Sequence, residues 1–184
     1  MFDERGDLRR NEALVFNADE ARAAVYFKRH LVAGLESAFT PGDAALALPD
    51  KTGIMICKDM DFQATLRSDA TSSHPTLVAV PAWDFDGDGW WHARLAIMRG
   101  VEDGFAVARA AKQGLLSLSD AYGRLTAWKP SSKDGMVTLV GDLARGPGDT
   151  LYLRLGDAFA WLSIAVSGLL MAVASLHARN DRNC

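Results

Sequence analysis

The sequence is short of cysteine and of basic clusters, and each shortage excludes a class of protein. Its 184 residues contain two cysteines, Cys57 and Cys184, too few for a disulfide framework. Lysine and arginine number 20 against 23 aspartates and glutamates, which gives a formal net charge of −3. No basic run is long enough to follow a phosphate backbone, so we expect no nucleic-acid partner. Residues 1–10 are charged and contain no apolar run, so we expect no signal peptide in this chain.

Apolar segments and turn residues predict an α/β domain with a mixed sheet. A hairpin is expected over 12–27, where two apolar runs flank a turn that begins at Asn17. Strands alternate with helices up to about residue 110 and then meet in hairpins, which is the order of an α/β sandwich. Further strands are expected over 53–57, 76–81, 105–110, 115–120, 125–128 and 136–143, and helices over 61–70 and 90–104.

An uncharged stretch lies near the C-terminus. Residues 158–176 carry no charged side chain, and at about 1.5 Å per residue they approach the roughly 30 Å of a bilayer core. We predict a transmembrane helix there, after a linker over 151–157. Three residues follow that favour a cytoplasmic tail over 177–184: His177, Arg179 and Arg182. The alternative is a buried helix of a soluble protein, because Ala, Ser and Gly make the span weakly hydrophobic.

Two residues suited to nucleophilic catalysis follow predicted strands. Cys57 ends the strand 53–57, and a thiol at a strand-to-helix turn lies at the sheet edge, where backbone N–H groups can hold an oxyanion. Lys28 follows the hairpin, and an ammonium near a thiol favours the thiolate and stabilises a developing oxyanion. Glu36 can orient this lysine or transfer a proton. Each has an ordinary alternative: Cys57 as a small buried apolar residue, and Lys28 and Glu36 as solvated loop residues.

The loop at 81–89 combines acidic residues with glycine and is expected to form a wall of the active-site pocket. It is not an EF-hand loop, because the twelfth residue counted from Asp84 is Leu95 rather than glutamate. We therefore predict no metal site. His92 is a rival general base, since Cys–His pairs are common in thiol hydrolases, but the lysine explains more of the sequence.

A series of motifs runs along residues 11–176. In order they are Asn11 to Phe16 followed by a turn, Tyr26-x-Lys28-x-His30-Leu31-Val32-x-Gly34-x-Glu36, Ile56-Cys57-x-Asp59, Trp83, His92-x-Arg94-x-x-x-Met98-Arg99-x-x-Glu102-x-Gly104, Arg109-Ala110, Gly114-Leu115 and Asp120-x-x-Gly123-Arg124. This order and spacing resemble the carbon–nitrogen hydrolase (nitrilase) superfamily, and within it the apolipoprotein N-acyltransferase branch. The resemblance implies an αββα sandwich, of which residues 1–150 are the C-terminal part, followed by the membrane helix.

The resemblance also implies roles for individual residues. Cys57 matches the nucleophile, Lys28 the family lysine, and Glu36 the second acidic residue after it. Lys28 and the backbone N–H of Lys58 match the oxyanion stabilisers. Two residues are expected to line the pocket: Trp83 and Asp59.

The membrane branch of this family passes an acyl chain from a phospholipid, through a cysteine thioester, to the N-terminal amine of a lipoprotein. We therefore expect an acyl donor (phospholipid or amide), an amine acceptor, no cofactor, and a catalytic part on the periplasmic or extracytoplasmic side of the inner membrane. The family's general-base glutamate lies on an earlier strand, and neither Glu4 nor Glu12 has its context. A C-terminal fragment is expected, with an upstream chain as a candidate for the missing half. The alternatives are a soluble amidohydrolase and a catalytically dead remnant.

Overall fold

The computed structural model describes residues 2–3, 9–19, 21–85, 87–131 and 135–180. The chain forms two compact units, Met1–Leu153 and Arg154–Cys184. The elements are β1 (Phe2–Asp3), β2 (Arg10–Phe16), β3 (Arg22–Phe27), β4 (Leu46–Ala47), β5 (Thr52–Ile54), the 3-10 helix η1 (Cys57–Asp61), α1 (Gln63–Ser73), β6 (Leu77–Trp83), α2 (Gly89–Asp103), β7 (Ala106–Lys112), β8 (Leu115–Ser119), β9 (Leu125–Pro130), α3 (Leu151–Leu155) and α4 (Ala158–Asn180).

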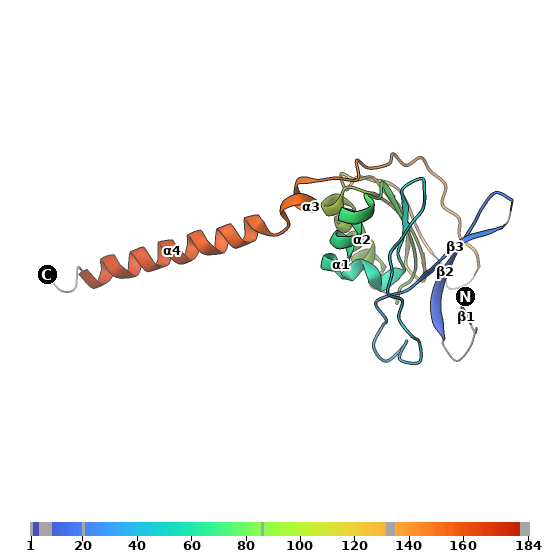
Figure 1. Cartoon of the computed structure of the whole chain (residues 1–184), viewed down its shortest axis with the longest axis horizontal. Helices are drawn as coiled ribbons and strands as arrows, with labels where there is room; N and C mark the ends of the chain where they lie inside the picture. The colour runs from blue at the N-terminus through green and yellow to red at the C-terminus, as the bar shows by residue number, and fades with distance from the viewer. Residues whose placement is uncertain (1, 4–8, 20, 86, 132–134, 181–184) are drawn as a thin grey trace. The chain divides into compact units, whose positions relative to one another are not determined.

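A six-stranded mixed sheet forms the centre of the first unit. Its order is β4-β5-β6-β7-β8-β9, with β5, β6 and β7 parallel and the other pairs antiparallel. Helices α1 and α2 lie on one side of these strands (Figure 1). Val78, Val80 and Val107 pack into one apolar core with Leu66 of α1 and Ala96 of α2. The helices thus bury one face of the sheet.

The hairpin β2–β3 packs against the other face. Tyr26 forms a buried cluster with Ile54 and Ile56, and Ala13 and Ala79 pack against it. Because side chains alternate along a strand, Ala79 faces the hairpin while its neighbours Val78 and Val80 face the helices. The sheet therefore lies between a helical layer and a hairpin layer, and the end of β3 comes near the end of β5.

The structure confirms the mixed sheet, the hairpin over 12–27 and the two helices. Helix α2 ends where the sequence predicts, because Gly104 takes the left-handed C-cap conformation at φ 81°. The strand predicted over 136–143 is wrong: this segment has no regular structure, and Met136 and Val140 are 95% and 87% exposed. Gly141 lies against the side chains of Leu118 in β8 and Ala127 in β9, so the segment passes over the face of these strands instead of extending the sheet. The strand predicted over 53–57 ends at Ile54.

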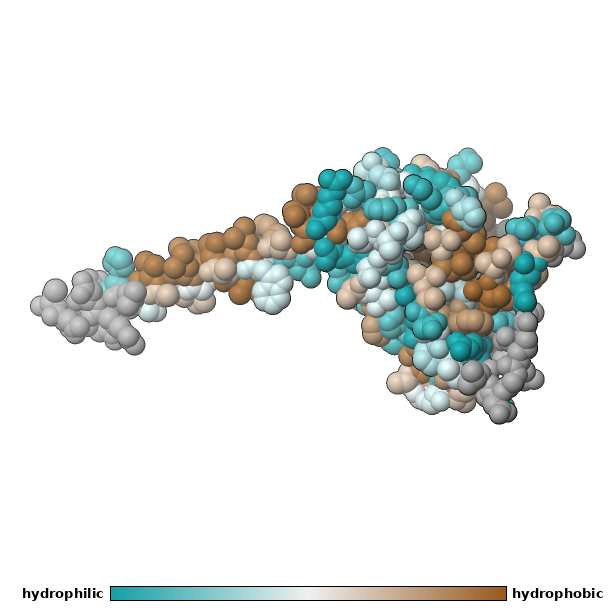
Figure 2. Space-filling model, viewed as in Figure 1, coloured by the Kyte–Doolittle hydropathy of each residue, from teal (hydrophilic) through white to brown (hydrophobic). Residues whose placement is uncertain are grey.

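The second unit contains α4, which begins at Ala158, the first residue of the predicted span, and continues beyond the end of that span to Asn180. Ala158–Ser175 is long and apolar enough to cross a membrane, on length and composition alone, and no other helix in the described residues meets that test. Apolar side chains follow its length in Figure 2. The predicted linker is partly helical, because it contains α3. Residues 181–184 of the predicted tail lie outside the described residues.

Candidate active site

Lys28 lies directly after β3 and is only 3% exposed. Its ammonium Nζ is 2.6 Å from Glu36 Oε2. The same oxygen accepts the backbone N–H of Val32 at 2.6 Å, and Glu36 Oε1 accepts the side-chain amide of Asn11 at 2.6 Å. Burial raises the pKa of Glu36, but hydrogen bonds from Lys28, Val32 and Asn11 outweigh it and hold that pKa below its usual value. Glu36 is thus an ionised acceptor that orients Lys28.

Cys57 occupies a strained turn at the end of β5. Its backbone φ is 46°, in the left-handed region that costs a residue with a Cβ about 1–2 kcal/mol. Ile56 before it is extended, and η1 begins at Cys57, so the thiol lies where the extended chain changes to a helical turn. The thiol Sγ lies 3.7 Å from the backbone oxygen of Trp83, and Lys58 follows in the first turn of η1. A turn of this kind presents a nucleophile at the sheet edge.

Asp59 is buried, and its carboxylate fastens the Lys28 segment to the Cys57 turn. Oδ2 accepts the backbone N–H of Ile56 at 3.0 Å and the hydroxyl of Tyr26 at 2.8 Å. Oδ1 accepts the backbone N–H of His30 at 2.8 Å, and that of Arg29 at 3.2 Å. One carboxylate therefore holds residues on both sides of Lys28 against the residue before Cys57.

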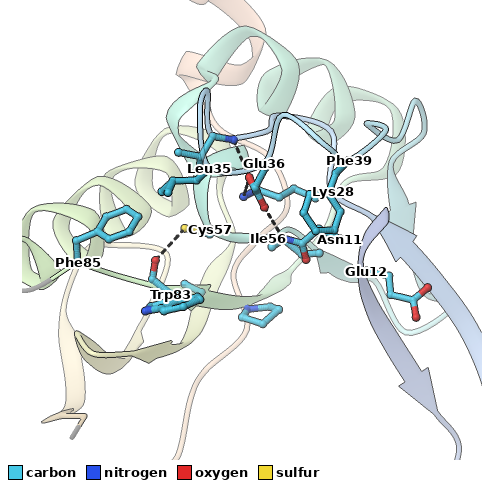
Figure 3. Close-up of a pocket in the computed structure, with 13 residues that line it drawn as sticks. Asn11, Glu12, Lys28, Leu35, Glu36, Phe39, Ile56, Cys57, Trp83 and Phe85 are labelled. Atoms are coloured by element: carbon cyan, nitrogen blue, oxygen red, sulfur yellow. Dashed lines mark hydrogen bonds and ion pairs between the residues drawn. The ribbon is translucent and has the colours of Figure 1, made fainter. Parts of the chain in front are cut away.

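A cavity of about 450 Å³ lies between these two segments. The residues that line it are Asn11, Glu12, Lys28, Val32, Leu35, Glu36, Phe39, Ile56, Cys57, Pro81, Ala82, Trp83 and Phe85. In Figure 3 the side chain of Lys28 extends toward the side of the cavity that holds Cys57. The structure thus brings together four of the residues predicted for the site: Lys28, Glu36, Cys57 and Trp83. Asp59 does not line this cavity. Its prediction as a pocket residue is corrected, because its carboxylate is turned into the buried network beneath the turn.

The wall formed by Trp83 and Phe85 is fixed from below by a buried ion pair. Arg109 Nη1 donates to Asp84 Oδ2 at 2.9 Å and to the backbone oxygen of Leu115 at 3.2 Å, and a second guanidinium nitrogen bonds Asp84 Oδ1. Gly114 is required here, because a Cβ at this position would come within 1.9 Å of Asp84 Oδ2. Asp84 of the acidic loop is therefore engaged in the ion pair with Arg109.

Three further residues complete the comparison with the sequence. His92, the rival base, does not line the cavity, and its Nε2 lies 3.4 Å from Asp88 Oδ2. Glu12 lines the cavity but points away from Cys57 (Figure 3). Asn11 was missed as a site residue. Its signal was available: it is a polar residue on the strand face that also carries Ala13 and Val15, both packed on the hairpin core.

Comparisons with known proteins agree with the motifs. No family model matches the chain. An apolipoprotein N-acyltransferase from Geobacter metallireducens is 28% identical over 159 residues, and one from Brucella melitensis is 34% identical over 151 residues; these matches cover 80% and 79% of this chain. The chain spans only 29% and 27% of the two relatives.

Solved structures share the fold. A carbon–nitrogen hydrolase from Helicobacter pylori superposes with a TM-score of 0.61 at 21% identity, covering 71% of this chain and 56% of that one. A mutant amidase from Nesterenkonia sp. AN1, with acrylamide added at its active site cysteine, superposes with the same TM-score and identity, covering 71% of this chain and 57% of that one. The resemblance to the carbon–nitrogen hydrolase superfamily, nearest to apolipoprotein N-acyltransferases, is confirmed.

Proposed function

Since the chain is related in sequence to the apolipoprotein N-acyltransferases and has the nitrilase fold, we propose that it transfers an acyl group to an amine through a thioester on Cys57. The observation that carries this proposal is the shared cavity. A thiol in a strained turn and a buried lysine, oriented by an ionised glutamate, open on one mostly apolar space.

The reaction has two steps. The sulfur of Cys57 attacks the carbonyl carbon of the donor, a tetrahedral oxyanion forms, and the bond from carbon to the leaving group breaks. The proton lost by the thiol ends on the leaving group, and the acyl group remains as a thioester. An amine then attacks the thioester, and the amide product leaves as Cys57 recovers its proton from the attacking nitrogen.

Lys28 and the backbone N–H of Lys58 stabilise the oxyanion in both steps. A cation and a peptide N–H aimed at a developing negative charge, in a site with mostly apolar walls, are worth more than in water. Glu36 holds the lysine and does not carry the proton, because its two oxygens already accept hydrogen bonds from Lys28, Val32 and Asn11. Lys28 therefore assists the thiol by its charge.

We place this chemistry at a membrane. In the proposal α4 spans the inner membrane, the tail after it is cytoplasmic, and the catalytic unit lies on the periplasmic or extracytoplasmic side. The donor is then a phospholipid ester or another acyl compound, and the apolar residues Leu35, Phe39 and Phe85 contact its chain.

The test is direct detection of the acyl-enzyme. The full chain in detergent, carrying Cys184→Ser, is mixed with p-nitrophenyl octanoate, and its intact mass is followed. We expect the mass to rise by one octanoyl group, and not to rise in the matched Cys57→Ala variant. Addition of glycine ethyl ester should then release octanoyl-glycine ethyl ester.

The outcomes separate the candidate functions. Release of octanoic acid without amide product would favour an amidohydrolase of the nitrilase type. Failure of the folded protein to acquire the octanoyl group would contradict the proposal and leave a catalytically dead remnant.

A further inference from the structure

Asn11 touches both members of the Lys28–Glu36 pair. Its backbone oxygen accepts the N–H of Lys28 at 2.8 Å, and its side-chain amide donates to Glu36 Oε1 at 2.6 Å. Asn11 belongs to β2, whereas Lys28 follows β3 and Glu36 lies in the loop beyond. One residue of a neighbouring strand therefore holds the two ends of a pair that are eight residues apart.

The hydrogen bond from the Asn11 side chain leaves the two oxygens of Glu36 with different partners. Oε2 receives the Lys28 ammonium and the Val32 N–H, and Oε1 receives Asn11. An ionised carboxylate only accepts hydrogen bonds, so the Asn11 group that faces it must be the NH₂. With Oε1 held in this way, the carboxylate cannot rotate and present its other oxygen to the lysine. The direction of the Lys28 ammonium into the cavity follows from that restriction.

We infer that Asn11 is a positioning residue of the acyl-transfer site: by locking the carboxylate of Glu36, it fixes the ammonium of Lys28 where it assists Cys57. This inference rests on the proposed function, because it assumes that Lys28 acts on the thiol. Asn11 itself need not touch the substrate.

The inference predicts coupling between Asn11 and Glu36. Each side chain alone, when removed, frees Lys28 to move, so Asn11→Ala and Glu36→Gln should each slow alkylation of Cys57 by iodoacetamide near neutral pH. Because Asn11 acts through Glu36, adding Asn11→Ala to Glu36→Gln should change the rate little further. At alkaline pH, above about 9.5, where an ordinary thiol is ionised, all variants should react at similar rates.

The experiment is a double-mutant cycle in the full chain in detergent, with Cys184→Ser so that a single thiol reacts. We expect each single variant to react three- to tenfold more slowly near neutral pH, and the double variant to match Glu36→Gln within about twofold. Asn11→Asp should be slower still, because a second carboxylate beside Glu36 draws the ammonium away. Asn17→Asp is the matched control: it makes the same charge change on the exposed turn of the same hairpin, and should leave the rate unchanged.

The outcomes distinguish the two proposals. If Lys28→Ala leaves the alkylation rate near neutral pH unchanged, the lysine does not assist the thiol, and the proposed function and this inference both fall. If Lys28→Ala slows alkylation but Asn11→Ala does not, or if the effects of Asn11→Ala and Glu36→Gln simply multiply, only the role of Asn11 is wrong. A melting temperature recorded for each variant identifies any that fails to fold. If Asn11→Ala fails to fold, Asn11→Ser takes its place in the same cycle.

Discussion

Tyr26 and Asp59 are joined by a buried hydrogen bond of 2.8 Å, in which the tyrosine hydroxyl donates to the carboxylate. Burial and then the charge of Asp59 raise the pKa of Tyr26, so its hydroxyl remains a donor. The bond joins β3 to the turn that begins at Cys57, two residues before Lys28 and two residues after the thiol. The approach of the lysine to the cysteine is therefore built into the core of the fold.

Replacement of Asp59 should loosen this junction. Asp59→Asn removes one acceptor oxygen and the charge from a site where both oxygens accept two donors or more, so several buried donors lose a partner. We expect the free energy of unfolding to fall by about 2–3 kcal/mol, measured by urea denaturation. Asp61→Asn, on the same turn but half-buried and paired with Lys58, is the matched control and should cost less than about 1 kcal/mol. If the two variants lose equal free energy of unfolding, Asp59 does not hold the two segments together.

The strained backbone at Cys57 predicts that glycine is more stable than alanine at this position. Glycine takes φ 46° freely, whereas alanine at that angle is strained. Cys57→Gly should therefore be more stable than Cys57→Ala by about 1 kcal/mol, seen as a higher melting temperature. The same two substitutions at Thr126 in β9 should rank in the opposite order. A less stable glycine variant at residue 57 would show that the turn is unstrained.

Asp103 gives the stability a pH dependence. Its side chain is fully buried and has no hydrogen-bond partner among the residues that the structure describes, and burial followed by the charge of Glu102 raises its pKa to about 7. A carboxyl whose pKa is raised by folding stabilises the protein below its unfolded pKa, about 3.9, and loses that contribution as the pH rises through 7. Stability should fall by up to about 1.4 kcal/mol per pH unit between these values.

The measurement for Asp103 is urea denaturation at several pH values. Asp103→Asn should flatten the dependence between about pH 4 and pH 7, because the amide does not titrate. Asp142→Asn, on the irregular segment, is the control and should leave the slope unchanged. An unchanged slope in Asp103→Asn would contradict this account of the buried carboxyl.

The orientation proposed for α4 can be tested with single cysteines. With Cys57→Ser, Cys184 is the remaining thiol, and an impermeant maleimide should label it only after the cells are opened. Tyr122→Cys, added to a chain that carries Cys57→Ser and Cys184→Ser, places a thiol on an exposed residue of the first unit and should be labelled from outside. Release of the protein by carbonate would contradict a spanning helix, and reversed labelling would contradict the orientation.

Much of the fold could be predicted because local signals agreed with tertiary contacts. The helix from Trp90 combined an apolar repeat with a C-terminal glycine, and Gly104 adopts the left-handed conformation that this signal implies. The strand predicted over 136–143 rested mainly on the apolar residues of that segment. Inside it, Gly141 lies against the side chains of Leu118 in β8 and Ala127 in β9, so the segment runs over these strands as irregular chain.

The reacting groups of the site could be predicted from the sequence, but the backbone conformation and the buried hydrogen bonds that hold them could not. Cys57 stood out because it ended a predicted strand, and Lys28 because it followed one. Sequence patterns do not reveal that a non-glycine residue at 57 adopts a positive φ, because few residues with a Cβ do so. Nor do they show that Asp59 turns inward to the hairpin, since that depends on contacts about thirty residues away.

Acylation of Cys57 in a lysine variant tests the central claim most directly. The rate of octanoyl transfer from p-nitrophenyl octanoate is compared in the parent chain, Lys28→Met and Lys58→Met, all carrying Cys184→Ser. Loss of an oxyanion-stabilising cation should slow acylation about 10²- to 10³-fold in Lys28→Met. Lys58→Met should stay within about twofold of the parent, because only the backbone N–H of Lys58 is assigned a role and its side chain pairs with Asp61. Equal rates in Lys28→Met and the parent would contradict a shared acyl-transfer site.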